Sequence, residues 1–463
     1  MRDGANPAPE SGMAKSQETI RILRRLLAEG MTARAERLLS RMRPADRGPV
    51  LSGLSPPEVR TVMDLLFEKR RAASTLKELP PELLPQIFDA IGDERLAQIM
   101  ARLELDDRVE VADELDDERR ERVIGLLPEN ARSELRMAEV YPPSSAGRVM
   151  TTRYIALHED MTAQQAIEKL REAGDTLESI LYLYVVDEKG ALRGVVPIRR
   201  LVAASPDKRC AELMVKDPAS VRVDADQEQA AQLVSRYNLL AIPVVNEEQH
   251  LLGVITVDDV IEVIEEEATE DMYLLAGLSE EDRVFSPASR AVRRRLPWLL
   301  INLGTAFLAA SVVGLFQDTL ERLVALAFFM PVVAGMGGNT GIQSLTVITR
   351  AIALGELAFS SGLRAIGKEV SVALANGAVL GAISGLAAFI WQDNAVLGVA
   401  LFVSMIVTMG VAGVMGAAVP LLLKALRQDP AVASGVIVTT FTDVLGFATF
   451  LGIGTYLLER WGL

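Results

Sequence analysis

The residue of this sequence best suited to chemistry is Asp443, a carboxylate near the middle of the apolar segment Ala431–Leu458. The segment exceeds the roughly 20 residues that a helix needs to cross a bilayer, and Asp443 is its only charge. A bare carboxylate in a membrane is costly, so such an acid normally faces a protein interior or a wet cavity and handles an ion or a proton. The alternative is a helix-packing acid, hydrogen-bonded to a neighbour such as Thr442 or Asn376. The position therefore indicates either an ion pathway or a packing role.

A second group of carboxylates lies between Asp258 and Asp282, a stretch without Lys or Arg. Four of these acids recur every fourth residue and share one helical face: Asp258, Glu262, Glu266 and Glu270. Like charges at this spacing destabilise a helix by about 0.2–0.5 kcal/mol per pair. Divalent cations would compensate, since carboxylates ligate Mg2+ directly or hold its waters. The alternative is an ordinary solvated acidic face.

The composition limits the kinds of ligand and metal site that the chain can form. The chain has 463 residues and a net charge of -14, with nearly all charge before Arg295. This acidic balance argues against nucleic acid as a partner and favours cations. Cys210 is the only cysteine, so a disulfide within the chain is excluded. His158 and His250 are the only histidines, which leaves too few for a His-based transition-metal site or a Ser/His/Asp triad. A hard cation held by oxygen remains.

Two internal repeats organise the half before Arg295. Four leucines precede helix-start signatures at spacings of 25, 24 and 24 residues: Leu54, Leu79, Leu103 and Leu127. A constant period of this size indicates a helical solenoid; the alternative is an irregular helical domain with chance spacing. A second repeat aligns residues 149–170 with 213–234 and 184–201 with 243–260. Each unit reads as strand, helix, strand, turn, strand and helix, and this order resembles a CBS-domain pair. The resemblance implies a regulatory module that binds nucleotides or ions between its units.

The remaining third is apolar and predicts five membrane spans: Pro297–Phe316, Leu323–Thr349, Val370–Trp391, Ala395–Leu423 and Ala431–Leu458. Asp443 is the only charged residue within them. Basic residues at alternate ends place the soluble half in the cytoplasm and the C-terminus outside. In the second span, Pro331 and the GGNTG motif around Asn339 predict a break in the helix that lines a cavity; the alternative is close helix packing through small residues.

The expected fold is therefore multidomain, with an all-α superhelical N-terminal domain, an α/β CBS-domain pair and an all-α polytopic membrane domain with five transmembrane helices. We expect a disordered tail at 1–13, the helical domain at 14–145 and CBS units at 146–205 and 206–268. An acidic connecting helix at 269–295 and the membrane domain at 296–463 follow.

This order of parts, with GGNTG and TTFTDV in the membrane half, closely resembles the MgtE family of bacterial magnesium channels. The resemblance implies a homodimer in the bacterial inner membrane that imports Mg2+ and closes when cytoplasmic Mg2+ is high. It implies that Asp443 recognises hydrated Mg2+, that Asn339 is the motif asparagine, and that Asp429, Pro430 and Ala431 form the DPA segment.

The resemblance also implies regulatory Mg2+ sites at cytoplasmic acids, which fall on Asp226, Glu228, Asp259, Glu262, Glu267, Glu270, Asp271, Asp106 and Glu110. Two positions depart from the family pattern: Ile342 stands where GGNTGNQS has asparagine, and Asn238 stands where an acid can occur in the second CBS unit. The sequence leaves ATP binding at the CBS pair open, and likewise Co2+ or Ni2+ as permeant ions.

Two other functions stay open at this point. A secondary transporter would use Asp443 to couple divalent-cation flux to protons or Na+. A membrane-anchored sensor without flux would bind a nucleotide or an ion at the CBS pair. An enzyme is not expected, because the sequence offers no nucleophile with a base, no phosphate loop and no His or Cys metal cluster.

Overall fold

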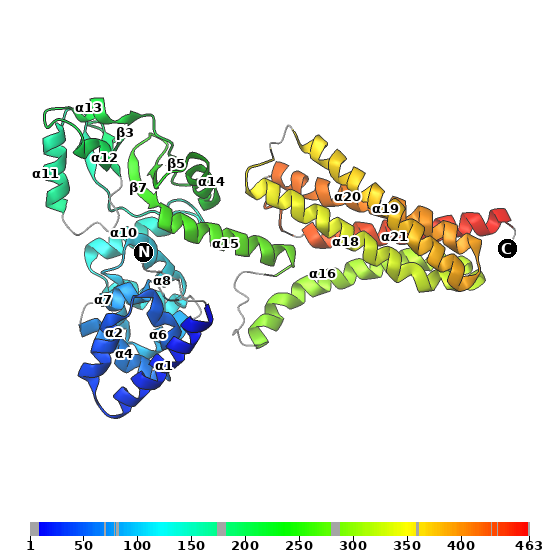
Figure 1. Cartoon of the computed structure of the whole chain (residues 1–463), viewed down its shortest axis with the longest axis horizontal. Coiled ribbons are helices and arrows are strands. Elements are labelled where there is room, and N and C mark those ends of the chain that lie inside the picture. Colours follow the sequence, from blue (N-terminus) through cyan, green and yellow to red (C-terminus); the bar gives the residue numbers. More distant parts are fainter. Residues whose placement is uncertain are drawn as a thin grey trace, which may run out of the picture. The chain divides into compact units, whose positions relative to one another are not determined.

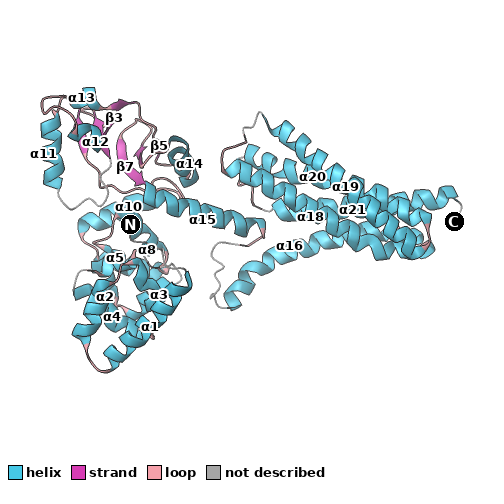
Figure 2. Cartoon of the chain, in the orientation of Figure 1, coloured by secondary structure: helices cyan, strands magenta, loops and turns pink. Residues whose placement is uncertain are grey.

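The computed structural model describes residues 9–68, 71–77, 79, 83–173, 182–278, 288–357, 361–426, 428–432 and 434–461. The chain divides into two compact units, Met1–Ile264 and Glu265–Leu463 (Figure 1). The first unit combines a helical domain with two small sheets, whereas the described part of the second consists of helices and connecting loops (Figure 2).

In the part of the helical domain that the structure describes there are ten α-helices: α1 (Pro9–Ala28), α2 (Thr32–Arg41), α3 (Gly48–Leu51), α4 (Pro56–Glu68), α5 (Ala72–Leu76), α6 (Leu84–Ala90), α7 (Asp93–Met100), α8 (Leu105–Asp113), α9 (Asp117–Leu126) and α10 (Glu129–Glu139). The four repeat leucines each precede a helix and are at least 93% buried. Buried Arg108 donates hydrogen bonds to the carbonyls of Met100 and Leu103, which satisfies the end of α7. The predicted helical repeat is therefore a row of core positions.

The N-terminal tail expected at 1–13 falls largely outside the described residues, which begin at Pro9, the first residue of α1. Proline is tolerated in the first turn of a helix, where its missing N–H has no intrahelical partner.

Two sheets repeat one order of elements and confirm the predicted CBS pair. The first CBS unit comprises β1 (Ala156–His158), α11 (Ala163–Ala173), β2 (Tyr182–Val186), β3 (Leu192–Pro197), α12 (Ile198–Val202), α13 (Cys210–Leu213) and β4 (Val215–Lys216). The second comprises β5 (Val221–Arg222), α14 (Gln227–Tyr237), β6 (Ala241–Val245) and β7 (Leu251–Thr256). In both sheets the first two strands pair in parallel and the third pairs antiparallel to the second.

The glycine of each GV pair explains how the two CBS units hold together. A Cβ on Gly194 would lie 2.6 Å from the sulfur of Met214, and one on Gly253 would lie 2.7 Å from the sulfur of Met150. Gly194 thus admits the segment between α13 and β4, and Gly253 admits the segment before β1 of the other CBS unit. A side chain at either position would force these segments apart.

Helix α15 (Val257–Leu275) carries most of the acidic stretch. It begins where Asp259 accepts hydrogen bonds from the backbone N–H and the hydroxyl of Thr256, as in a capping box. It ends at Gly277, whose positive φ of 71° accompanies hydrogen bonds from Gly277 N to Leu274 O and from Leu278 N to Tyr273 O. This pair of bonds is a Schellman motif. Glu280, Glu281 and Asp282 lie outside the described residues.

Among its described residues, the membrane half has five helices long and apolar enough to cross a bilayer, as predicted: α16 (Ala288–Gly314), α18 (Ala325–Ala353), α19 (Gly362–Gln392), α20 (Ala395–Ala425) and α21 (Ser434–Trp461). The short helix α17 (Gln317–Arg322) joins α16 to α18. Within this half, 61% of the apolar window of α20 is buried, against 6% for α16. Helix α20 is therefore the central helix of the membrane half, and it packs on α18, α19 and α21 (Figure 1).

The prediction that the second span is interrupted is wrong. Helix α18 is continuous through Pro331 and through the GGNTG residues 337–341. Its glycines instead admit neighbouring helices: a Cβ on Gly337 would lie 2.8 Å from the Thr408 methyl group, and Gly341 lies against Val438. The alternative interpretation, close packing through small residues, is the correct one.

Candidate functional site

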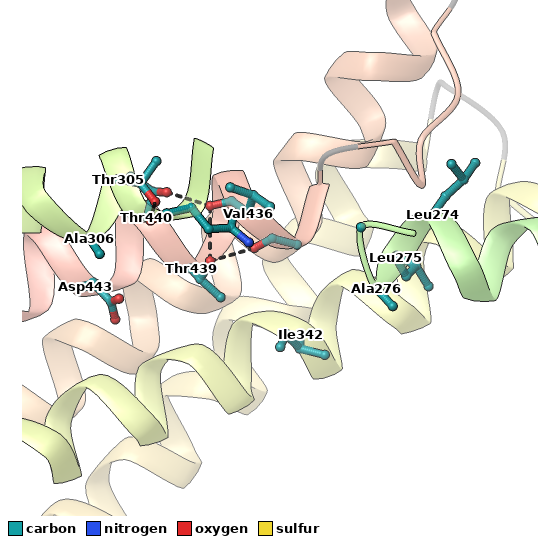
Figure 3. A pocket seen from close by; sticks show the side chains of 13 residues that line it. Leu274, Leu275, Ala276, Thr305, Ala306, Ile342, Val436, Thr439, Thr440 and Asp443 are labelled. Carbon is teal, nitrogen blue, oxygen red and sulfur yellow. Dashed lines mark hydrogen bonds between the residues drawn. The ribbon is translucent and has the colours of Figure 1, made fainter. Parts of the chain in front are cut away.

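Asp443 lies on α21 and lines a pocket of about 360 Å3 within the second unit. Helix α16 contributes Asn302, Thr305 and Ala306, α18 contributes Ile342, and α21 contributes Gly435, Val436, Thr439 and Thr440 beside Asp443. The carboxylate projects into the space between α21 and α18, toward which Ile342 also points (Figure 3). No Lys or Arg is among the lining residues, so the negative charge of Asp443 is not neutralised within the pocket.

The helix-packing role considered for Asp443 has no support in the geometry. No residue within the described ranges donates a hydrogen bond to its carboxylate. Thr442 donates its hydroxyl to the Thr439 carbonyl, 2.9 Å away, and Asn376 is exposed on α19. Both oxygens of Asp443 therefore remain available to water or to a hydrated cation.

Threonine hydroxyls extend the polar wall of the pocket on α21. Thr439 donates to the Gly435 carbonyl at 2.9 Å, and Thr440 donates to the Val436 carbonyl at 2.6 Å (Figure 3). Because the hydroxyl protons are used by the backbone, the hydroxyl oxygens present lone pairs. Thr439 and Asp443 are four residues apart and share one face of the helix. Together they offer oxygen acceptors, the ligand type that Mg2+ and its waters prefer.

Asn339 does not reach this pocket within the single chain. It lies exposed on α18, three residues before Ile342, which lines the pocket and is 47% exposed. Residues three apart lie on one helical face. The departure from the family motif thus places an apolar side chain, rather than an amide, on the wall that faces Asp443.

The turn that follows α15 lines the same pocket. Leu274, Leu275, Ala276 and Gly277 form part of its wall (Figure 3). The Leu275 carbonyl lies close to Gly435, where a Cβ would come within 3.0 Å of it. The acidic helix therefore ends at the mouth of the pocket that contains Asp443.

Asp271 and Asp429 form an acidic pair near this end of α15. Burial raises the pKa of Asp271 to about 6, and the charge of Asp429 adds to the shift. Asp429 accepts a hydrogen bond from Ala431 N at 2.6 Å, which fixes the DPA segment just before α21. Two carboxylates placed so close together gain from a cation between them.

A second acidic cluster surrounds Asp106 on α8. Burial raises the pKa of Asp106 well above its usual range, and Asp107, Asp259 and Glu104 add to the shift. Asp106 Oδ1 is buried without a hydrogen-bond partner in the part of the chain that the structure describes. A buried acceptor without a donor is costly, so this oxygen is suited to bind a cation or to accept a hydrogen bond from one of its waters.

Lys77 offsets this cluster only in part. Its ammonium lies 3.4 Å from Asp107, yet the pKa of Asp107 and that of Asp259 are both raised, mainly by burial. Glu104 instead accepts a hydrogen bond from the Thr151 hydroxyl at 2.8 Å. The structure thus brings predicted Asp106 and Asp259 together, and adds Asp107 and Glu104, which the sequence did not single out.

Asp226 and Asn238 cap the two ends of α14, and Glu228 lies in its first turn. Asp226 is the N-cap, and its carboxylate accepts from Glu228 N at 2.9 Å. Asn238 ends the helix in the left-handed region, with φ of 50°, a conformation that asparagine tolerates better than most residues. The second departure from the family pattern therefore serves as a helix cap.

The other predicted acids lie along helical surfaces. Glu110 is exposed on α8, one turn beyond Asp106, and Glu262 is exposed on α15, whereas Glu267 and Glu270 are half-buried on α15. Within the described residues, no three His, Cys, Asp or Glu side chains are placed to hold a metal ion directly. The acids occur in pairs and rows, an arrangement suited to Mg2+ that keeps several of its waters.

Sequence reasoning missed one charged group inside the membrane half. Glu369 is 4% exposed on α19, which begins at Gly362 rather than near Val370 as predicted. Its position beside Lys368 made it read as part of a loop. A lysine followed by an acid at the edge of an apolar segment is the signal that could have identified it, since long basic side chains reach out of a membrane from such positions.

Comparison with known protein families assigns the same parts. Residues 330–453 match the model described as a divalent cation transporter, residues 42–144 match the MgtE intracellular N domain, and residues 146–207 and 210–266 each match the CBS domain.

Individual relatives cover nearly the whole chain. The magnesium transporter MgtE of Thermus thermophilus is 37% identical over 94% of this chain and 98% of its own length. Its Bacillus subtilis counterpart is 34% identical over 89% of this chain and 93% of its own. A crystal structure of the cytosolic domain of the Mg2+ channel MgtE in complex with ATP is 36% identical, with a TM-score of 0.50, over 52% of this chain and 98% of that structure.

Proposed function

The chain belongs to the MgtE family of magnesium transporters, and we propose that it carries Mg2+ through its membrane half along a path that passes Asp443. The observation that carries this proposal is the Asp443 carboxylate, which lies in a pocket between membrane-crossing helices without a hydrogen-bond donor among the described residues. An intramembrane acid placed in this way handles an ion.

The size of the pocket supports a hydrated ion. Mg2+ loses its waters reluctantly, and six waters at about 30 Å3 each occupy about 180 Å3. The pocket of about 360 Å3 has room for such an ion. Its waters would donate to Asp443 and to the oxygens of Thr439 and Thr440. A second copy of the chain would place a second Asp443 near the path, and we include this homodimer in the proposal.

The proposed direction of Mg2+ movement follows from the basic residues of the membrane half and from the membrane potential. The basic residues at alternate span ends favour cytoplasmic soluble domains and an external C-terminus, in the bacterial inner membrane. A membrane potential that is negative inside favours inward movement of a charge by about 2.3 kcal/mol per 100 mV, or about 4.6 kcal/mol for Mg2+. Import therefore needs no second ion gradient.

The acidic pairs support a gating function for cytoplasmic Mg2+. At low Mg2+ the buried carboxylates around Asp106 and Asp259, and those of Asp271 and Asp429, repel one another. Bound Mg2+ would remove this repulsion, stabilise the packed arrangement and hold the end of α15 over the pocket. Mg2+ shifts the equilibrium only by its differential affinity for the two states. The predicted sensor residues Asp226, Glu228, Glu262, Glu267, Glu270 and Glu110 belong to this proposal as weaker, additional contacts.

ATP is a further proposed ligand of the CBS pair. The support is the likeness to the cytosolic domain crystallised with ATP. ATP binding would act on the same soluble unit and would complement the Mg2+ response.

The test is Mg2+ uptake into proteoliposomes, measured with a fluorescent indicator, for the natural sequence, Asp443→Asn and Asp318→Asn. Asp318 is an exposed acid of α17 and serves as the matched control. We expect Asp443→Asn to abolish uptake, Asp318→Asn to leave it unchanged, and high Mg2+ on the cytoplasmic side to suppress it. Unchanged uptake in Asp443→Asn would refute the assigned path.

The same vesicles distinguish the rival function. An imposed proton or Na+ gradient should not change the initial rate at a clamped membrane potential. A rate that follows either gradient would replace the channel with a coupled secondary transporter.

A further inference from the structure

Glu369 is a nearly buried carboxylate in the membrane half, and both of its oxygens have partners. Its Oε2 accepts a hydrogen bond from the Ser344 hydroxyl of α18 at 2.9 Å. Its Oε1 pairs with the ammonium of Lys368 at 2.6 Å. Ser344 is itself 4% exposed, whereas the Lys368 side chain is 63% exposed. A charged, buried hydrogen bond thus connects α18 to α19.

This arrangement differs from that of Asp443. The charge of Glu369 is paired with Lys368, each of its oxygens has a protein partner, and it is absent from the residues that line the Asp443 pocket. These features disfavour a second ion site. They are typical of a carboxylate that holds neighbouring helices in one arrangement.

Helix α20 lies behind this bond and brings α18 and α19 together. A Cβ on Gly416 would lie 2.9 Å from Ser344 Cβ, and a Cβ on Gly413 would lie 3.2 Å from the Glu369 carbonyl oxygen. Both helices therefore rest on the same glycine face of α20. Close contact through small residues sets the distance between helices. The directional bond between Ser344 and Glu369 adds a further restriction on rotation of α18 about its axis.

The rotation of α18 matters because Ile342 lies two residues before Ser344. Two residues correspond to about 200° around an α-helix, so the two side chains lie on nearly opposite faces. Ile342 faces the Asp443 pocket, and Ser344 faces Glu369. The hydrogen bond to Ser344 holds one face of α18, and it therefore determines which side chain the opposite face presents to the pocket.

We propose that Glu369 is a positioning residue which, through Ser344, holds the rotation of α18 that presents position 342 to the Asp443 pocket. Its consequence for Mg2+ flux rests on the proposed function, whereas its consequence for geometry does not. Glu369→Ala and Ser344→Ala should both allow α18 to rotate. Glu369→Gln should restore the position, because an amide oxygen still accepts from Ser344.

The geometric test uses a thiol at position 342. Cys210, the only cysteine, is buried and is replaced by Ser, and Ile342→Cys is introduced into this background in the full-length chain. The rate of modification by a charged methanethiosulfonate reagent is then compared with and without a change at Glu369 or Ser344. We expect a several-fold slower reaction in Glu369→Ala and in Ser344→Ala, and a rate within twofold of the parent in Glu369→Gln.

The control removes a different buried hydrogen bond of the membrane half. Thr319 and Thr455 hydroxyls lie 2.7 Å apart and connect α17 to α21, so Thr319→Val should leave the thiol rate unchanged. An unchanged rate in folded Ser344→Ala would overturn the proposal, as would an equal loss in Thr319→Val. If the rates change as expected while no variant and no parent transports Mg2+, the positioning role stands and the proposed function fails.

Discussion

Gly277 lies directly against the indole ring of Trp298: a Cβ on Gly277 would come within 2.6 Å of Trp298 Nε1. Gly277 has φ of 71° and ends α15, and Trp298 belongs to α16. The absence of a side chain therefore serves two purposes, since it permits the left-handed turn and lets that turn rest on α16. This contact seats the end of the acidic helix at the pocket that Asp443 lines.

We expect Gly277→Ala to weaken the closure produced by cytoplasmic Mg2+. The left-handed conformation alone costs a non-glycine residue about 1–2 kcal/mol, and the clash with Trp298 adds to it. Because 1.4 kcal/mol corresponds to a factor of ten, the inhibitory Mg2+ concentration in the uptake assay should rise about tenfold or more. Gly190→Ala is the control, since Gly190 also has a positive φ but has no atom within 4 Å of its Cβ position. An equal rise in both variants would show that the Trp298 contact is irrelevant.

Stability without Mg2+ should depend on pH through Asp271. Its pKa in the fold is about 6, above the ordinary 3.8, so the folded state binds the proton more tightly than the unfolded state does. The ionised carboxylate therefore destabilises the fold fully above about pH 6, and this penalty disappears as the pH falls from 6 toward 4. Asp271→Asn should raise the thermal midpoint at pH 7.5 and change it little at pH 4.5. A midpoint that is equally altered at both pH values would contradict this explanation.

Asp106 should link stability to Mg2+ in the soluble unit. Burial beside other acids raises its pKa, so the fold disfavours its ionised form when no cation is bound. In the full-length protein, Asp106→Asn should be more stable than the natural sequence in chelator and should gain less from added Mg2+. A difference of 1 kcal/mol corresponds to a shift of about 2–4 °C in the thermal midpoint. Glu118→Gln, at a side chain that is 92% exposed, should behave like the natural sequence. Equal stabilisation of both by Mg2+ would argue against a site at Asp106.

Ile342→Asn should increase the apparent affinity for transported Mg2+. An amide on this wall can hydrogen-bond the waters of the ion, and one such bond contributes about 0.5–1.5 kcal/mol. The half-saturating Mg2+ concentration should therefore fall about two- to tenfold. The control is Val347→Asn, which places the same amide on an exposed position of α18 outside the pocket lining. An unchanged half-saturating concentration in Ile342→Asn would show that this wall does not contact the hydrated ion.

The sequence by itself determined the parts and their order. The leucine spacing, the repeated strand pattern and the five apolar segments are local features, and local periodicity and hydropathy reflect which face of an element is buried. For the same reason Asp443 could be identified, because a charge in a long apolar segment is conspicuous without any knowledge of its neighbours.

Only the tertiary structure decided what the side chains contact. The glycines and the proline of α18 are compatible with a broken helix and equally with a continuous helix that packs closely on its neighbours. The contacts with Thr408 and Val438 decide for the continuous helix, and both residues are distant in the sequence. The partners of Glu369 and Asp106 likewise come from other helices, as does the wall that Ile342 shares with Asp443. Such contacts depend on the rotation and packing of whole helices, which are set by long-range fit rather than by any short segment.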